Sequence, residues 1–285
     1  MSDSITPFNR SMDRDDLFHP EARPTVQAIH QLIRDMYAKG VYMTSWYGTL
    51  EKPNTGVGMD NRGPNYEPLP DAVDDERIPW FLYWEIEAMV RAFKGKLGPG
   101  VRVLDAGGTS SLFSFFLASL GCEVHSIDIN PSLIKNSNLV AKKMGWNLHA
   151  YSMDVSRMEF KEGFFDHCFS ICVFEHLDFY LKQRAFVEFH RTMKPGGWVG
   201  ITFDYNNPAP YVFDCMAFDD RYRNQLDSPE RVKQVFTANG LFEFAGNQEF
   251  IDNGKRYLSP PREAKVKNPR DYSFGALVLR RKDFW

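Results

Sequence analysis

The pattern of apolar and polar positions changes near residue 100. Beyond it, short apolar runs alternate with segments whose apolar residues recur at helical spacing. This alternation predicts strands over 101–106, 123–127, 147–151, 165–171 and 198–203, and helices over 110–120, 131–144, 179–193 and 229–238. Strands that alternate with helices are joined by right-handed crossovers, so we expect a mainly parallel sheet with helices on both faces.

The last two predicted strands, 241–245 and 274–281, have no helical pattern between them. The intervening residues 248–273 contain Pro260, Pro261 and Pro269 and indicate a loop. Strands joined without a crossover helix are usually antiparallel, so the sheet is expected to end in an antiparallel strand.

The first hundred residues follow a different pattern. Residues 1–23 are polar and predict a poorly ordered segment, whereas apolar residues from Val26 to Met36 predict a helix that stops at Gly40. Residues 41–79 are rich in Gly, Pro, Asn and Asp, and a second helix is expected over 80–96. We therefore divide the chain into an N-terminal helical and loop cap (1–96) and an α/β domain (97–285), with substrate insertions near 205–227 and 248–273.

Composition narrows the classes of partner. The 285 residues are 43% hydrophobic and 25% charged, which is ordinary for a globular protein. The net charge of −3 and the lack of a long Lys/Arg run give no reason to expect a nucleic acid or an anionic membrane as partner. There is neither an apolar signal segment nor a C-x-x-C pair, so we expect a cytoplasmic protein without a bound metal. The oligomeric state is left open.

Candidate binding residues follow the first two predicted strands. The first strand runs into Asp105-Ala106-Gly107-Gly108-Thr109, and the second ends at Asp128. Glycines at a strand end let the backbone approach a ligand closely, and an acidic residue about 20 positions further on suits ribose hydroxyls. Several nucleotide cofactors share this pairing. The alternative is a turn glycine and a helix-capping aspartate without a ligand.

Five segments, taken in their order along the chain, narrow the choice of cofactor. They are VLDAGG, IDI, MDV, FD with VFEHL, and MKPGGWVGITF. In this order they resemble class I S-adenosylmethionine-dependent methyltransferases. The resemblance implies a Rossmann-like, seven-stranded sheet with S-adenosyl-L-methionine across its carboxyl edge. It places the loop 105–109 at the methionine part, Asp128 at the ribose and Asp154 at the adenine. The implied cofactor contacts are Asp105, Gly107, Gly108, Thr109, Asp128, Ile129, Asp154, Val155 and Cys172.

The glycine loop departs from this family's pattern. Thr109 and Ser111 stand where further glycines often occur. Their hydroxyls can bind the cofactor or cap the following helix. The G-x-G-x-x-G pattern of dinucleotide-binding proteins is also unmet, which disfavours a nicotinamide-dependent oxidoreductase.

The residues that would remove a proton from the acceptor or bind it follow less specific patterns than the cofactor residues. His176 follows the fourth strand of the domain, and Asp204 and Tyr205 end the fifth, so each is a candidate base. A bracing role for Glu175 and His176 is the alternative. Aromatic residues outside the predicted sheet can line an acceptor pocket or a lid: Trp46, Tyr47, Trp80, Tyr83 and Tyr211.

The sequence thus predicts methyl transfer to an oxygen or nitrogen of a small molecule, such as a sugar or another metabolite. Two alternatives remain. One is a non-catalytic cofactor-binding or interaction module of the same fold, and the other is a methyltransferase acting on a macromolecule.

Overall fold

The computed structural model describes residues 8–44, 47–51, 78–208, 226–259 and 270–283. They form two compact units. The first spans Arg14–Asp154, and the second combines Pro7–Asp13 with Val155–Trp285. The predicted boundary between residues 96 and 97 stays a prediction. Among the described residues, no helix is both long enough and apolar enough to cross a membrane.

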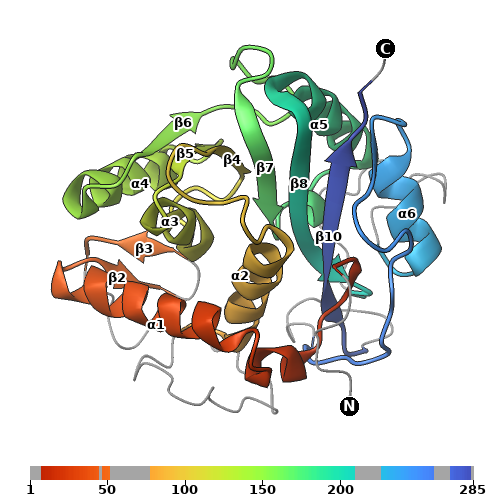
Figure 1. The fold of residues 1–285 in the computed structure, drawn as a ribbon, viewed down its shortest axis with the longest axis horizontal. Helices are drawn as coiled ribbons and strands as arrows, with labels where there is room; N and C mark the ends of the chain where they lie inside the picture. Colours follow the sequence, from red (N-terminus) through yellow and green to blue (C-terminus); the bar gives the residue numbers. More distant parts are fainter. Residues whose placement is uncertain (1–7, 45–46, 52–77, 209–225, 260–269, 284–285) are drawn as a thin grey trace. The chain divides into compact units, whose positions relative to one another are not determined.

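The first unit contains a parallel sheet built from the predicted alternation. Its strands are β4 (Arg102–Ala106), β5 (Glu123–Asp128) and β6 (Leu148–Ser152), with β5 hydrogen-bonded to both neighbours. The helices α3 (Leu112–Ser119) and α4 (Pro131–Met144) connect these strands and pack against β5 and β6 (Figure 1). Local signals set the bounds of α4, because Asn130 caps its start and Gly145 ends it at φ 76°.

Three further helical segments belong to the first unit. They are the 3-10 helix η1 (Arg14–Phe18), α1 (Arg23–Ala38) and α2 (Trp80–Ala92), which pack against one another. Ile29, Ile33 and Met36 form the buried stripe of α1. Trp84 donates its indole N–H to Asp16 at 3.0 Å. Residues 14–23 are therefore folded, and the expected disorder is wrong for them, because buried contacts rather than periodicity fix this segment.

A pair of two-residue strands follows α1. β2 (Tyr42–Met43) and β3 (Gly48–Thr49) pair antiparallel. A strand of two residues has no periodicity to recognise, so the sequence showed only a loop here.

The second unit contains the remaining strands. β7 (Phe165–Ile171) and β8 (Met193–Tyr205) are parallel, and β10 (Ser273–Arg281) is antiparallel to β8 and to β9 (Phe242–Phe244). The 3-10 helix η2 (Phe174–His176) and α5 (Phe179–Thr192) connect β7 to β8, and α6 (Pro229–Thr237) precedes β9. The predicted α/β fold class, with its antiparallel last strand, is confirmed.

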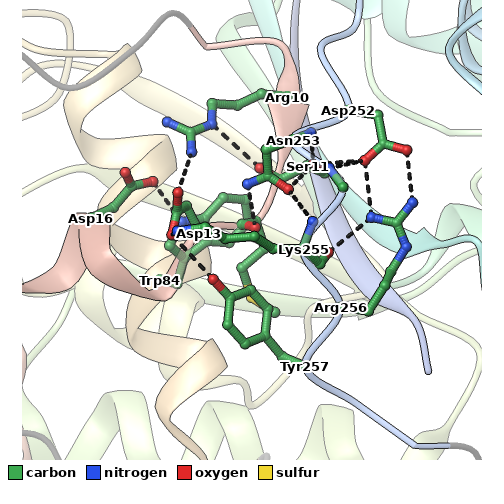
Figure 2. Close-up of polar contacts among 12 residues, drawn as sticks. Arg10, Ser11, Asp13, Asp16, Trp84, Asp252, Asn253, Lys255, Arg256 and Tyr257 are labelled. Atoms are coloured by element: carbon green, nitrogen blue, oxygen red, sulfur yellow. Dashed lines mark hydrogen bonds and ion pairs between the residues drawn. The ribbon is translucent and has the colours of Figure 1, made fainter.

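The polar segment 8–13 is part of this second unit. β1 (Arg10–Ser11) pairs antiparallel with β10. The buried Asn9 donates to the carbonyls of Ala245 and Asn247 and accepts from the Val278 N–H, with distances of 2.6–2.8 Å. Figure 2 shows further contacts of this segment with the loop 252–257, among them Ser11 with Asn253, and Asp13 with Lys255 and Tyr257. The expected disorder is therefore also wrong for the described residues 8–13.

Candidate functional site

Asp105 lies at the carboxyl end of β4 in the first unit and is 0% exposed. Ser114 donates to its Oδ2 at 2.5 Å, while Oδ1 has no hydrogen-bond partner within the described residues. Burial raises the pKa of Asp105 to about 7, and the charge of Asp128 adds to this, although the Ser114 hydrogen bond opposes it. A buried carboxylate with an unsatisfied oxygen favours a cation nearby.

Two glycines shape the loop that follows. Gly107 has φ 82°, and its N–H donates to the Ile127 carbonyl at 2.8 Å. A Cβ on Gly108 would overlap both carboxylate oxygens of Asp105. The first glycine is required by the backbone conformation and the second by close packing.

The hydroxyls that replace glycine in this loop have partners inside the protein. Thr109 is buried and shares a 2.8 Å hydrogen bond with Ser126. Ser111 caps α3 by accepting from the Ser114 N–H at 3.1 Å. Because both hydroxyls have partners within the protein, Thr109 would contact a cofactor through its main-chain groups.

The ends of β5 and β6 carry the other predicted cofactor residues. Asp128 is half-buried and accepts from the Asn130 N–H at 2.8 Å, and burial raises its pKa. Ile129, directly after it, is 80% exposed. Asp154 is exposed and Val155 is half-buried. An acidic group, an exposed apolar side chain and a glycine cradle at adjacent strand ends fit a positively charged nucleoside cofactor.

In the second unit, three acidic or thiol groups lie close together at the carboxyl ends of β7 and β8. The ligand atoms of Cys172, Glu175 and Asp204 all lie within 4.8 Å of one another, and we call these residues the acidic cluster. Glu175 is only 2% exposed, and the Asp204 N–H points to its Oε1 at 3.4 Å. The cluster can hold a cation or accept hydrogen bonds from a ligand.

The charges of the acidic cluster act on the phenol of Tyr272. Burial raises the pKa of its phenol, and the charges of Asp204, Cys172 and Glu175 raise it further. Asp204 also accepts from the Asn207 side-chain amide at 2.6 Å. The sequence indicates only a bracing role for Glu175, which lies in the segment VFEHL.

The other two candidate bases differ in what surrounds them. His176 ends η2 and is exposed; desolvation and then the charge of Lys182 lower its pKa, which favours a neutral imidazole. Tyr205 is buried, and its hydroxyl donates to Asp252 at 3.1 Å. Arg256 binds the same carboxylate and lies over the Tyr205 ring. Because burial and Asp252 raise the pKa of Tyr205, its phenol stays protonated and suits positioning better than proton removal.

Of the aromatic residues predicted to line an acceptor pocket, those that the structure describes lie on α2 and next to β3. Tyr83 and Trp80 are buried in α2, and Tyr83 packs edge-to-face on His30 with ring centroids 5.1 Å apart. Tyr47 is 39% exposed and pairs with Ser111 of the glycine loop. Trp46 and Tyr211 lie outside the described residues.

Comparisons with known proteins agree with this geometry. Residues 104–201 match the family model described as a methyltransferase domain. The chain is 34% identical over 106 residues to uncharacterised proteins of Mycobacterium tuberculosis and Mycobacterium bovis, covering 37% of this chain. This match spans 38% of the length of those relatives.

Solved structures share the fold of a larger part of the chain. The [4+2]-cyclase SpnF aligns with a TM-score of 0.52 and 16% identity over 74% of this chain and 85% of its own. The PH0226 protein of Pyrococcus horikoshii aligns with a TM-score of 0.51 and 19% identity over 73% of this chain and 93% of its own. These likenesses confirm the Rossmann-like fold.

Together, the domain match and the fold identify residues 104–201 as a class I methyltransferase domain. S-adenosyl-L-methionine is the cofactor that a methyltransferase domain of this fold implies.

Proposed function

We propose that this chain transfers the methyl group of S-adenosyl-L-methionine to an oxygen or nitrogen of a small molecule. The observation that carries the proposal is the set of Asp105, Gly107, Gly108 and Asp128, retained at adjacent strand ends within a methyltransferase domain. A polypeptide with these residues keeps both the negative charge and the close backbone approach that a sulfonium nucleoside needs.

The cofactor would supply a methyl group already activated by its sulfonium. In the first unit, Asp105 would stabilise the cationic methionine part, and Asp128 would accept hydrogen bonds from the ribose. In the second unit, Glu175 and Asp204 would orient an O–H or N–H of the acceptor and accept its proton, with His176 as a further candidate base. Alignment of the acceptor atom with the methyl carbon supplies a large part of the rate enhancement.

A small acceptor is supported by the dimensions and charge of the candidate groups. The acidic cluster gathers three ligand atoms within 4.8 Å, which suits a single functional group. The net charge of −3 gives no attraction to a nucleic acid, so we propose metabolites rather than RNA or DNA as acceptors and the cytoplasm as the compartment.

Calorimetry followed by a transfer screen tests this proposal. The protein should bind S-adenosylmethionine and S-adenosylhomocysteine but not NAD. Labelled methyl groups should then appear on components of a metabolite extract. Glu175→Gln should keep cofactor binding and slow transfer strongly, whereas Glu249→Gln, at an exposed carboxyl, should leave both unchanged. A folded sample that binds neither sulfur ligand contradicts the proposal, as does transfer confined to RNA or protein.

A further inference from the structure

The short strand β3 is hydrogen-bonded to the glycine loop within the first unit. The Gly48 N–H donates to the Ser110 carbonyl at 2.9 Å, and the Ser110 hydroxyl donates to the Gly48 carbonyl at 2.9 Å. Tyr47 pairs with Ser111 as an antiparallel bridge. Three consecutive contacts therefore fix residues 47 and 48 on the loop predicted to hold the cofactor.

Asn136 completes this arrangement from α4. Its amide donates to the Ser110 hydroxyl at 2.6 Å and also to the Gly48 carbonyl. A Cβ on Gly48 would overlap the Phe115 ring and lie 3.2 Å from the Met36 methyl carbon, so glycine is required for this approach. We call Gly48, Ser110 and Asn136 the docking cluster.

The backbone of Ser110 indicates that its hydroxyl matters. Ser110 has φ 68°, a left-handed conformation that is unfavourable for a residue other than glycine. Glycine would adopt this conformation at lower cost, but it has no hydroxyl to bind Gly48. The Ser110 hydroxyl makes two hydrogen bonds, to Gly48 and from Asn136, and these offset the backbone strain and hold β3 on the loop.

The position of Tyr47 follows from the docking cluster. Its main chain lies on the loop that follows β4, while β3 packs against α4, the helix that follows Asp128. The Tyr47 side chain remains 39% exposed. Burial and then the charge of Asp128 raise the pKa of its phenol. Tyr47 thus offers a protonated phenol and a partly open ring beside the carboxyl end of β5.

We propose that Tyr47 contacts the ribose side of the bound cofactor and that the docking cluster positions it there. This inference rests on the proposed function, because it requires the first unit to bind S-adenosylmethionine. It assigns Tyr47 to the cofactor, whereas the sequence alone suggested the acceptor. The phenol O–H would donate to the cofactor, and the ring would shield the nearby hydrogen bonds from water.

Substitutions of Tyr47 test the contact directly. Tyr47→Ala should weaken S-adenosylhomocysteine binding about tenfold or more by calorimetry, because both ring and hydroxyl are lost. Tyr47→Phe keeps the ring and should weaken binding only about threefold. Tyr180→Ala removes an exposed tyrosine of the second unit and should bind as the wild type does. Thermal midpoints identify any variant that fails to fold, in which case Tyr47→Phe carries the test.

A second ligand locates the contact. 5′-Methylthioadenosine carries the ribose and adenine but lacks the amino-acid part. It should lose about the same factor as S-adenosylhomocysteine when Tyr47 is replaced by alanine. Unchanged binding of this ligand, with weaker binding of S-adenosylhomocysteine, overturns the assignment to the ribose side.

A double-mutant cycle tests the docking cluster as a positioning device. Ser110→Gly keeps the left-handed backbone and removes the hydroxyl, so it should weaken binding in the wild type by about threefold or more. In the Tyr47→Ala background it should change affinity by less than about twofold, because the residue that it positions is gone. Equal losses in both backgrounds contradict positioning.

The two proposals fail in different ways. Wild-type protein that binds no S-adenosylhomocysteine overturns the proposed function. Wild-type binding together with a Tyr47→Ala affinity within about twofold overturns the role of Tyr47 alone.

Discussion

The strand ends of the first unit and those of the second present polar groups in different ways. The glycine loop after β4 is tightly packed and internally hydrogen-bonded. Gly108 has no room for a side chain, and the hydroxyls of Thr109 and Ser110 bind other groups of the protein. At β7 and β8, the acidic cluster instead gathers a thiol and two carboxylates within 4.8 Å. The first region is defined by shape, and the second by concentrated negative charge.

This difference has a chemical consequence. A loop whose conformation is fixed by internal hydrogen bonds recognises one ligand shape and loses little entropy on binding it. Carboxylate oxygens gathered in one place can accept hydrogen bonds and a proton from a ligand. We therefore expect changes in the glycine loop to act on cofactor affinity, and changes in the acidic cluster to act on turnover.

The largest effect is expected from Gly108→Ala. The new Cβ would overlap the Asp105 carboxylate, which is buried and held by Ser114 and so has little freedom to move. S-adenosylhomocysteine affinity should fall at least about a hundredfold by calorimetry. Gly163→Ala is the control, since no atom lies within 4 Å of its new Cβ; its φ of 61° should cost stability only. Wild-type affinity in Gly108→Ala would show that the loop does not bind the cofactor.

Glu175→Gln should have the next largest effect, on the second region. The side chain keeps its shape but can no longer take a proton, so kcat should fall roughly 30-fold. We expect less than the effect of losing a sole base, because Asp204 remains beside it. Cofactor affinity should stay within about twofold, since the substitution leaves the first unit intact. The split between kcat and affinity is measured by transfer assays and calorimetry, and a loss in affinity alone would break the contrast between the regions.

The pH dependence of the glycine loop comes third. Asp105 has a pKa of about 7 when folded, above its ordinary 3.8, so the folded protein holds this proton more tightly than the unfolded chain does. Its contribution to stability is present below about pH 4 and is lost as the pH rises through about 7. A cationic cofactor would lower this pKa, so its binding should release a proton and strengthen about tenfold between pH 6 and 8.

Asp105→Asn supplies the reference for that measurement. The amide cannot ionise, so both the loss of unfolding free energy between about pH 4 and 7 and the proton release should shrink. Calorimetry in buffers of different ionisation enthalpy counts the released protons, and urea titrations follow the stability. Identical profiles for the wild type and Asp105→Asn would assign the pH dependence to other groups.

The same contrast separates what the sequence could predict from what it could not. The strands and helices after residue 100 follow the predicted order because each one is either a short buried apolar run or a helix with recurring apolar residues. Asp105, Gly107 and Asp128 stand out in the sequence because each lies at or just after the end of a predicted strand. The acidic cluster carries no such local pattern, since Cys172 and Asp204 come together only through the pairing of β7 with β8.

Long-range polar contacts are the features of the fold that the sequence pattern reveals least. Ser110 binds Gly48 across 62 positions of sequence, and Asn9 binds Val278 across 269. No periodicity connects such partners, because each interaction depends on one side chain meeting one backbone group. Polar segments such as 8–23 therefore suggested disorder, although in the structure they are held by hydrogen bonds and by buried residues such as Leu17 and Ala22.

The smallest expected effect concerns Thr109, whose hydroxyl the sequence assigned to the cofactor or to a helix cap. In the structure this hydroxyl is buried against Ser126 at 2.8 Å. Thr109→Val keeps the shape and leaves the Ser126 hydroxyl without this partner, so the free energy of unfolding should fall by about 1 kcal/mol in urea titrations. S-adenosylhomocysteine affinity should stay within about threefold, because the loop keeps its main-chain geometry. Thr109→Ser retains the hydroxyl and serves as the control. A tenfold loss of affinity in Thr109→Val at unchanged stability would instead place this hydroxyl on the cofactor, and the glycine loop would then recognise its ligand through side chains as well as through shape.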